Sequence, residues 1–205
     1  SDCLVGSEMC IRDSISIVPN SDVTTRSELE CEATAEDIDG DEITMSYRWR
    51  RVINDIASEI TIDGKTLSLT PAIGQPNDKY LCEVEAISNG LSTQDSTYVQ
   101  IRNSPPTIGN TEIVSYGSIR AGESVFCNSD INDIDEVEVT SSTEWRLNDT
   151  QILGLEYTLE LPENGVRAGD SLSCIITAQD SHGGEATESI EVFIENTPPV
   201  VENIS

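Results

Sequence analysis

Short stretches of alternating apolar and polar residues run through most of the chain. In residues 28–35, Leu29, Cys31, Ala33 and Ala35 alternate with acidic or hydroxyl-bearing residues. A period of two gives a β-strand one apolar face and one polar face. The same pattern recurs in residues 43–50, 80–86, 172–178 and 190–194, with shorter stretches at 66–69 and 157–161. No segment has a convincing helical periodicity, so the pattern predicts an all-β protein.

Turn-forming dipeptides separate these stretches. They are Asp39-Gly40, Asp63-Gly64, Asn89-Gly90, Asn164-Gly165 and Gly183-Gly184. About seven short strands in about 90–100 residues is typical of an antiparallel β-sandwich.

The pattern also repeats along the chain. Cys31 and Trp49 each recur 96 residues later, and Cys82 recurs 92 residues later, a difference that a deletion in a loop would give. The recurring residues are Cys127, Trp145 and Cys174. We therefore predict two copies of one unit.

Proline pairs mark the ends of the two units. Pro105-Pro106 and Pro198-Pro199 fix φ and favour extended backbone, so we interpret them as stiff linkers. We expect one domain in residues 15–104, a second in 105–197 and the start of a further repeat in 198–205. The chain is then a slice of a longer repeat protein.

Residues 1–14 do not follow the repeat and are expected to be non-native or disordered. Within them, residues 4–14 (LVGSEMCIRDS) resemble a translated sequencing-adapter fragment of the kind found in metagenomic data. The resemblance implies that Cys3 and Cys10 carry no function. The alternative is a small N-terminal loop closed by Cys3 and Cys10.

The order of Cys, Trp and Cys in each unit resembles the immunoglobulin fold. All four cysteines lie on the apolar face of their predicted strands, and Tyr80, two residues before Cys82, matches the tyrosine-corner position of that fold. The resemblance implies two tandem Ig-like antiparallel β-sandwich domains. It also implies the disulfides Cys31–Cys82 and Cys127–Cys174, packed against Trp49 and Trp145 respectively. Disulfides in turn imply a location outside the cytoplasm.

A second resemblance concerns function. Asp37-Ile38-Asp39-Gly40-Asp41 followed by Tyr47-Arg48-Trp49, with Pro-Pro at the ends of the units, resembles the Ig-like, cadherin-like and PKD-like repeats of bacterial surface proteins. It implies a non-enzymatic spacer segment of a secreted or cell-surface, adhesin-like protein involved in cell adhesion. Its partners would be neighbouring repeats of a longer chain and a surface or glycan ligand.

The alternative function is a carbohydrate- or protein-binding accessory module of an extracellular enzyme. Such a module usually exposes aromatic side chains on a face or loop. Aromatic residues make up 4% of this chain, and both tryptophans lie on apolar faces, so the spacer function is favoured. Solvent-exposed aromatic residues in the structure would favour the alternative.

Composition narrows the range of partners. The chain has 38 acidic and 11 basic residues and a net charge of -27. Repulsion from phosphate argues against nucleic acid and anionic membranes as partners. No apolar stretch approaches the roughly 18–20 residues that span a bilayer, so we expect no membrane insertion in this segment. The N-terminal residues also lack the features of a signal peptide.

Aspartates on one predicted turn are candidate ligands for Ca²⁺. Alternating carboxylates on a turn can converge on this hard cation, and Gly40 allows the tight bend. The turn recurs in the second unit with two aspartates, and a third follows a later strand. The six candidates are Asp37, Asp39, Asp41, Asp133, Asp135 and Asp180. The alternative is that these are ordinary solvated turns.

One phrase matches a catalytic motif. Gly169-Asp170-Ser171-Leu172 has the form of the nucleophile signature of a lipase/esterase family. That family also needs an Asp-x-x-His pair near its C-terminus, and the spacing around His182, the one histidine, does not match it. A similar phrase occurs in residues 120–124, also just before a cysteine. We therefore interpret it as a turn before a strand and expect no enzyme.

Overall fold

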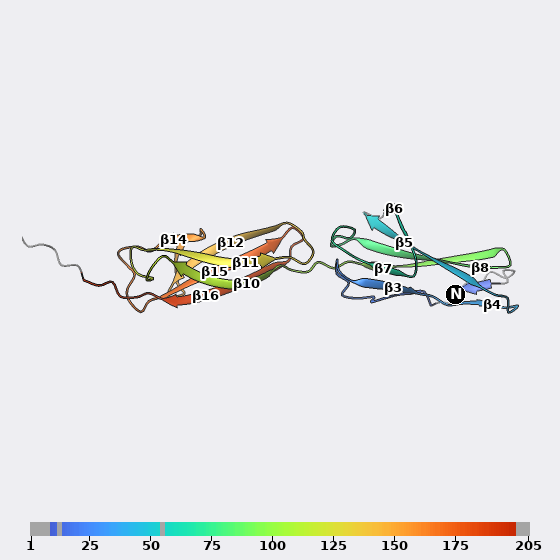
Figure 1. Cartoon of the computed structure of the whole chain (residues 1–205), viewed down its shortest axis with the longest axis horizontal. Helices are drawn as coiled ribbons and strands as arrows, with labels where there is room; N and C mark the ends of the chain where they lie inside the picture. Colours follow the sequence, from blue (N-terminus) through green and yellow to red (C-terminus); the bar gives the residue numbers. More distant parts are fainter. Residues whose placement is uncertain (1–8, 12–13, 54–55, 200–205) are drawn as a thin grey trace, which may run out of the picture. The chain divides into compact units, whose positions relative to one another are not determined.

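The structure is a computed structural model that describes residues 9–11, 14–53 and 56–199, with side chains for all of these except 9–11 and 57–61 (Figure 1). This part of the chain forms strands and turns and no helix. The chain divides into two compact units, which we call unit one (Ser1–Ser104) and unit two (Pro105–Ser205). Cys3, the side chain of Cys10 and residues 200–205 lie outside the described part, so the expectations for them stay predictions.

Unit one contains a three-stranded and a four-stranded antiparallel sheet. The first has the order β2 (Ser16–Val18), β3 (Glu28–Glu32) and β7 (Thr66–Ser68). The second has the order β6 (Ile56–Asp63), β5 (Thr44–Ile53), β8 (Lys79–Ser88) and β9 (Leu91–Gln100). The backbone of β1 (Met9–Ile11) also pairs with β4 (Ala35–Asp37), which the sequence pattern does not predict.

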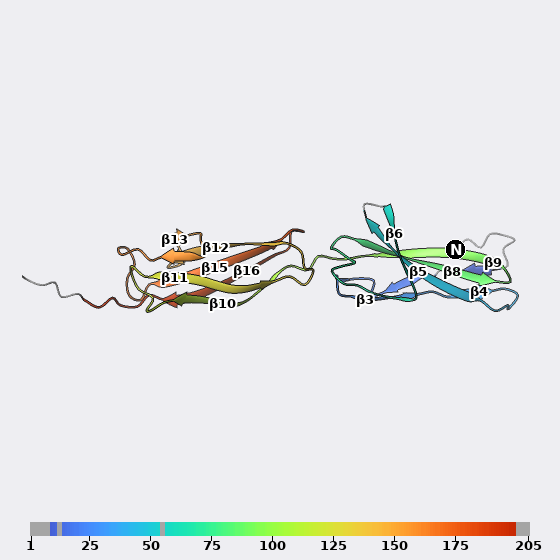
Figure 2. The same ribbon diagram turned by 45° about the horizontal axis from the view of Figure 1, so that its top comes forward.

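Unit two repeats this arrangement of three strands and four. The smaller sheet has the order β10 (Thr107–Ser115), β11 (Ser124–Asn132) and β14 (Thr158–Glu160). The larger has the order β13 (Gln151–Gly154), β12 (Val139–Leu147), β15 (Ser171–Asp180) and β16 (Glu185–Phe193). Strand β10 runs beside β16, where the two sheets meet (Figure 1, Figure 2). The protein is therefore all-β, with two tandem Ig-like β-sandwiches.

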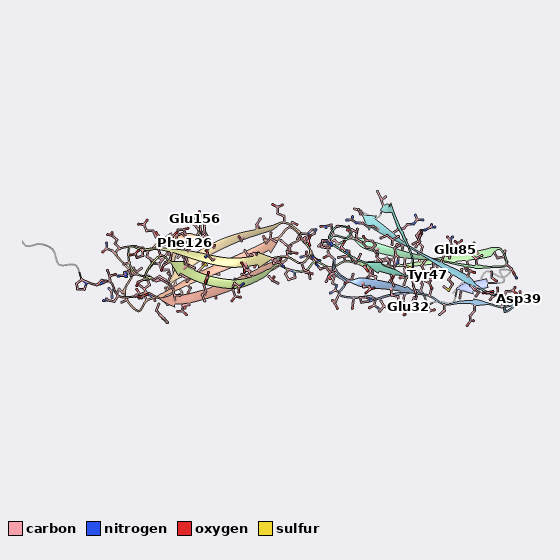
Figure 3. The ribbon with its side chains drawn as sticks, viewed as in Figure 1. Glu32, Asp39, Tyr47, Glu85, Phe126 and Glu156 are labelled. Carbon is pink, nitrogen blue, oxygen red and sulfur yellow. A yellow bond between two sulfur atoms is a disulfide. The ribbon has the colours of Figure 1, made fainter. Side chains whose placement is uncertain are left out.

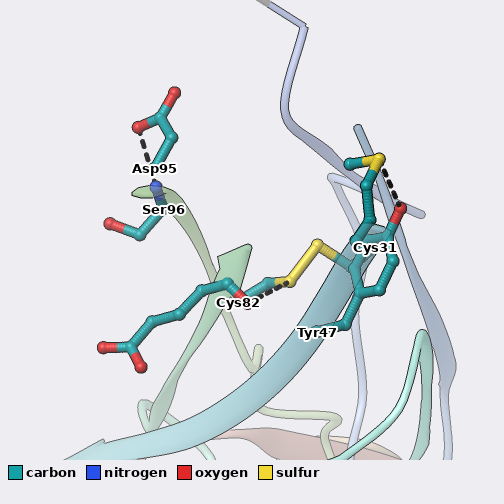
Figure 4. Close-up of a disulfide and its surroundings, with 7 residues drawn as sticks. Cys31, Tyr47, Cys82, Asp95 and Ser96 are labelled. Atoms are coloured by element: carbon teal, nitrogen blue, oxygen red, sulfur yellow. Dashed lines mark hydrogen bonds between the residues drawn. A yellow bond between two sulfur atoms is a disulfide. The ribbon is translucent and has the colours of Figure 1, made fainter. Parts of the chain in front are cut away.

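Each sandwich is centred on a disulfide and a tryptophan. In unit one, Cys31 on β3 is bonded to Cys82 on β8, so the disulfide joins the two sheets (Figure 4). Trp49 lies directly opposite Cys82 on β5 and is fully buried. Unit two has the same arrangement, with the disulfide Cys127–Cys174 and a fully buried Trp145 opposite Cys174. These disulfides are the two pairs that the immunoglobulin resemblance implies.

Tyr80 forms the tyrosine corner of unit one. Its ring is buried in the core, and its hydroxyl donates a hydrogen bond to the backbone carbonyl of Ile73. Burial raises the pKa of Tyr80 above its usual value. Leu172 takes this position in unit two and is fully buried without a hydroxyl, so the second sandwich closes on apolar packing alone at this point.

The Asn89-Gly90 turn sets the register of the longest hairpin. Both residues have positive φ, 48° and 81°, as a two-residue type I′ turn requires. The turn places Ser88 opposite Leu91 and aligns the ten residues of β8 with those of β9. It also fixes the loop that lies beside the aspartate turn described below.

In the described ranges, no helix has the length and apolarity that crossing a membrane would require.

Candidate functional site

The aspartate turn of unit one follows β4, and Asp39 marks it in Figure 3. One carboxylate oxygen of Asp37 accepts hydrogen bonds from the backbone amides of Asp39 (2.9 Å) and Asp41 (3.3 Å). Burial acts to raise the pKa of Asp37, but these two hydrogen bonds, together with smaller contributions from Ser88 and Gly40, hold the pKa below its usual value. The Asp41 carboxylate accepts a hydrogen bond from the side-chain amide of Asn89 in the β8–β9 hairpin. The Asp37 carboxylate thus stabilises the turn by accepting hydrogen bonds from the turn's own backbone amides.

The candidate aspartates of unit two are more deeply buried than those of unit one. Asp133, Asp135 and Asp180 are 8%, 0% and 5% exposed. The Oδ1 atom of Asp133 accepts a hydrogen bond from the Asp135 amide at 2.7 Å, whereas its Oδ2 atom is buried and has no hydrogen-bond partner among the described residues. The Asp180 carboxylate accepts hydrogen bonds from the amides of His182 (2.7 Å) and Gly184 (2.9 Å).

Electrostatics connect these three carboxylates. Burial raises the pKa of Asp133, and the negative charges of Asp135 and Asp180 raise it further, although the hydrogen bond from the Asp135 amide acts against them. In unit one, the last residue of β8 is Ser88, whereas the last residue of β15 in unit two is Asp180. Three buried carboxylates therefore interact in unit two only, within the part of the chain described here.

In this structure the side chains of the candidate calcium ligands are not positioned to coordinate a metal ion. In the described residues, no group of three or more His, Cys, Asp or Glu side chains is placed so that it could hold a metal ion. The chemistry in unit two still fits calcium, because it combines hard oxygen donors with a buried carboxylate oxygen that lacks a partner. Calcium binding stays a prediction, and it would require these side chains to move closer together.

The esterase-like segment Gly169-Asp170-Ser171-Leu172 forms the turn that leads into β15. Asp170 accepts hydrogen bonds from the Asn148 side chain (3.1 Å) and the Arg167 amide (2.7 Å), and in that order they lower its pKa. Ser171 is the first residue of β15, and its hydroxyl donates a hydrogen bond to the Glu191 carboxylate. His182 lies just beyond the other end of this ten-residue strand. At about 3.3 Å per residue the two are about 30 Å apart, so they do not form a catalytic pair.

Exposed aromatic residues occur, although both tryptophans are buried. Tyr116, Tyr157 and Phe193 in unit two are 94%, 62% and 67% exposed, and Tyr98 in unit one is 63% exposed. Tyr116, Phe126 and Tyr157 form a group that we call the aromatic cluster. The Tyr116 and Phe126 ring centroids are 5.4 Å apart at an interplanar angle of 82°, and the Phe126 and Tyr157 centroids are 6.3 Å apart at 39°.

Sequence reasoning missed this cluster. Its residues come from the segment after β10, from β11 and from the residue before β14, so no local motif contains them. The signal that would have found them is the repeat itself, because the corresponding positions of unit one are polar or charged.

Comparisons with known proteins assign no family. No family model and no curated protein matches the chain. Among solved structures, three N-terminal domains of the bacteriophage RB49 outer capsid protein Hoc share 13% identity with it at a TM-score of 0.36, covering 93% of this chain and 71% of that one. The FN1–FN3 domains of chicken CNTN1 share 10% at a TM-score of 0.34, with coverages of 86% and 66%. A chimeric titin Z1Z2 shares 16% at 0.30, with coverages of 85% and 92%. At these values the similarities carry no argument about function.

Proposed function

We propose that this segment is a non-enzymatic spacer of a secreted or cell-surface, adhesin-like bacterial protein. The observation that carries the proposal is the repetition of one unit with one architecture. Each unit has a three-stranded sheet, a four-stranded sheet and a disulfide between them. Repeated independent sandwiches lengthen a protein unit by unit, and other domains at the end of the parent protein carry its adhesive function.

The disulfides support a role outside the cytoplasm. Intrachain disulfides persist in oxidising compartments and are typical of extracellular domains. Each one here closes a loop of about half its unit, with sequence separations of 51 and 47. Closing loops of this length stabilises a fold by about 4 kcal/mol on the chain-entropy model. A spacer that must keep its length benefits from units that unfold rarely.

The segments between units are the second part of the proposal. Asn103-Ser104-Pro105-Pro106 separates the two units, and Asn196-Thr197-Pro198-Pro199 follows unit two. Proline fixes φ near −65° and restricts the residue before it, so these segments sample few conformations. The proposal is that they limit the angles between successive repeats.

Small-angle scattering of the whole chain tests the spacer function. The matched variant carries Pro105→Gly, which leaves the charge unchanged and replaces an exposed residue, whereas the buried Pro106 is kept. A spacer requires a narrow distribution of inter-unit distances in the wild type and a broader one in the glycine variant, since glycine restores backbone freedom. Equal distributions in the two proteins would contradict a spacer with stiff linkers.

A binding module is the second candidate, and the exposed aromatic residues favour it. The buried tryptophans remove the side chains that most often bind sugar rings, but the aromatic cluster of unit two remains available to a partner. Both functions are compatible in one chain, because a repeat protein can carry a binding site on one of its units.

A further inference from the structure

The aromatic cluster is not required by the fold, because unit one builds the same sheet without it. The backbone amide of Cys127 donates to the carbonyl of Tyr157 at 2.9 Å, and the amide of Cys31 donates to the carbonyl of Lys65 at the same distance. Phe126 pairs with Thr158 across the sheet as Glu30 pairs with Thr66. Tyr157 and Phe126 therefore occupy the positions of Lys65 and Glu30.

Unit one fills these positions with an ion pair. The Lys65 ammonium lies 2.6 Å from a carboxylate oxygen of Glu30. The hydrogen bond that the Lys65 ammonium donates to the Glu30 carboxylate raises the pKa of Lys65 above its usual value. This place on the sandwich thus accommodates an ammonium group in unit one, whereas in unit two the same positions hold the aromatic rings of Phe126 and Tyr157.

Charge around the cluster is strongly negative. Residues 105–205 contain 19 aspartates and glutamates, three arginines and no lysine. Glu112 on β10 and Glu160 on β14 face the same side of the sheet as Phe126, since residues two apart on a strand share a face and Glu112 and Glu160 pair with Asn128 and Ser124. Glu156 precedes Tyr157 and lies in this part of unit two (Figure 3). All three glutamates are exposed.

Ring orientation distinguishes between ligands. An extended sugar chain stacks best on rings that share one plane, but these rings are inclined by 82° and 39°. Inclined rings present their negative faces in several directions, which suits a compact cation. The same chemistry occurs within unit one, where the Lys79 ammonium lies 5.5 Å from the centroid of the Tyr98 ring.

We propose that the aromatic cluster of unit two binds lysine side chains of a cationic segment of a partner protein. The ammonium group lies against the faces of Tyr116 and Tyr157, and Glu112, Glu156 and Glu160 balance further positive charges of the segment. The net charge of the chain attracts such a segment from solution and repels anionic partners. This inference is independent of the spacer function, because it rests on unit two alone.

The test is an NMR titration of the whole chain with acetylated, amidated tetralysine, following the ring signals of Tyr116, Phe126 and Tyr157. We expect these signals to shift together and to give one dissociation constant. The main variant combines Phe126→Glu with Tyr157→Lys, which installs the ion pair of unit one and leaves the net charge unchanged. We expect its affinity for tetralysine to fall at least tenfold.

Two single variants separate ring electrostatics from apolar contact. Tyr157→Phe keeps the ring face, so its affinity should stay within twofold of the wild type. Tyr157→Leu keeps an apolar side chain without a ring and should weaken binding about fivefold. Tyr157 is exposed, so neither change should disturb folding.

Three results would overturn the proposal. The first is tetralysine binding that the Phe126→Glu, Tyr157→Lys variant leaves unchanged, because this would reflect general attraction to an acidic protein. The second is equal binding by the Tyr157→Leu and wild-type chains. The third is a neutral sugar chain, with cellotetraose as the probe, that shifts the same ring signals at equal or lower concentration, which would assign the cluster to a glycan.

Discussion

Trp145 donates its indole N–H to the backbone carbonyl of Glu156 at 2.8 Å, which ties the core of unit two to the segment that carries Tyr157. Trp49, at the same position of unit one, is equally buried, but its indole nitrogen has no acceptor among the described residues. The two tryptophans therefore fill the same space with different hydrogen bonding.

This difference predicts unequal effects of the same substitution. Trp145→Phe removes a hydrogen bond and leaves a carbonyl unpaired, whereas Trp49→Phe removes a donor that has no partner. We expect Trp145→Phe to lower the unfolding free energy of its unit by about 1 kcal/mol more than Trp49→Phe does. Urea denaturation checks this, because each variant retains one tryptophan whose fluorescence reports the other unit, and circular dichroism follows both. Equal losses would mean that the Glu156 contact contributes nothing.

Removing a disulfide should destabilise its own unit only. Cys31→Ala with Cys82→Ala, or Cys127→Ala with Cys174→Ala, should cost about 4 kcal/mol, because the unfolded chain regains the freedom that the closed loop had removed. Hydrogen exchange read by mass spectrometry assigns the loss to one unit, and the other serves as the internal control. Peptide mapping without reductant should give Cys31–Cys82 and Cys127–Cys174; a Cys82–Cys127 crosslink would contradict the arrangement.

Strands with one buried face are visible in the sequence, and strands at an edge are not. In β8, five residues from Tyr80 to Ser88 are buried at alternate positions, which is the pattern that predicted a strand there. Its neighbour β9 buries only Val99 and is polar on both faces. That strand exists because the Asn89-Gly90 turn returns the chain against β8, and this pairing is tertiary information that periodicity lacks.

The two candidate sites, the aspartate turns and the aromatic cluster, could also be predicted only in part from the sequence. The repeat predicted that Asp37 and Asp133 occupy the same turn, and both accept a hydrogen bond from the amide two residues later. Their opposite pKa directions were not predictable, because they depend on burial and on Asp180, which comes from another strand. The aromatic cluster likewise depends on three separate segments meeting on one sheet.

The pKa of Asp133 predicts a gain in stability on acidification. Because the folded state raises this pKa, the protonated carboxyl is favoured by folding, and that contribution is present below about pH 3.9 and is lost as the pH rises through the raised value. At pH 7 the buried charged carboxylate is a cost. We expect Asp133→Asn to stabilise unit two at pH 7, because it removes the buried charge, and to have little effect below pH 4.

The matching substitution in unit one should have the opposite sign. The folded state lowers the pKa of Asp37, so its contribution is present above the usual range for aspartate and is lost as the pH falls through the lowered value. Asp37→Asn should therefore destabilise unit one at pH 7. Denaturation from pH 3 to pH 7, with the Trp49→Phe chain reporting unit two and the Trp145→Phe chain reporting unit one, checks both. Parallel pH profiles for the two units would contradict the assignment.

Calcium should act on unit two more than on unit one. A cation bound among Asp133, Asp135 and Asp180 would neutralise the repulsion that raises the pKa of Asp133 and would supply a partner to its buried Oδ2 atom. For a site with a dissociation constant of about 1 mM, 10 mM calcium stabilises the folded unit by about 1.4 kcal/mol.

Hydrogen exchange of the whole chain, with and without calcium, should show added protection in β11, β12 and β15. Asp133→Asn should abolish that protection, and magnesium should not replace calcium, because it demands a tighter geometry. Protection that is equal in both units, or that survives in Asp133→Asn, would leave these aspartates as turn residues.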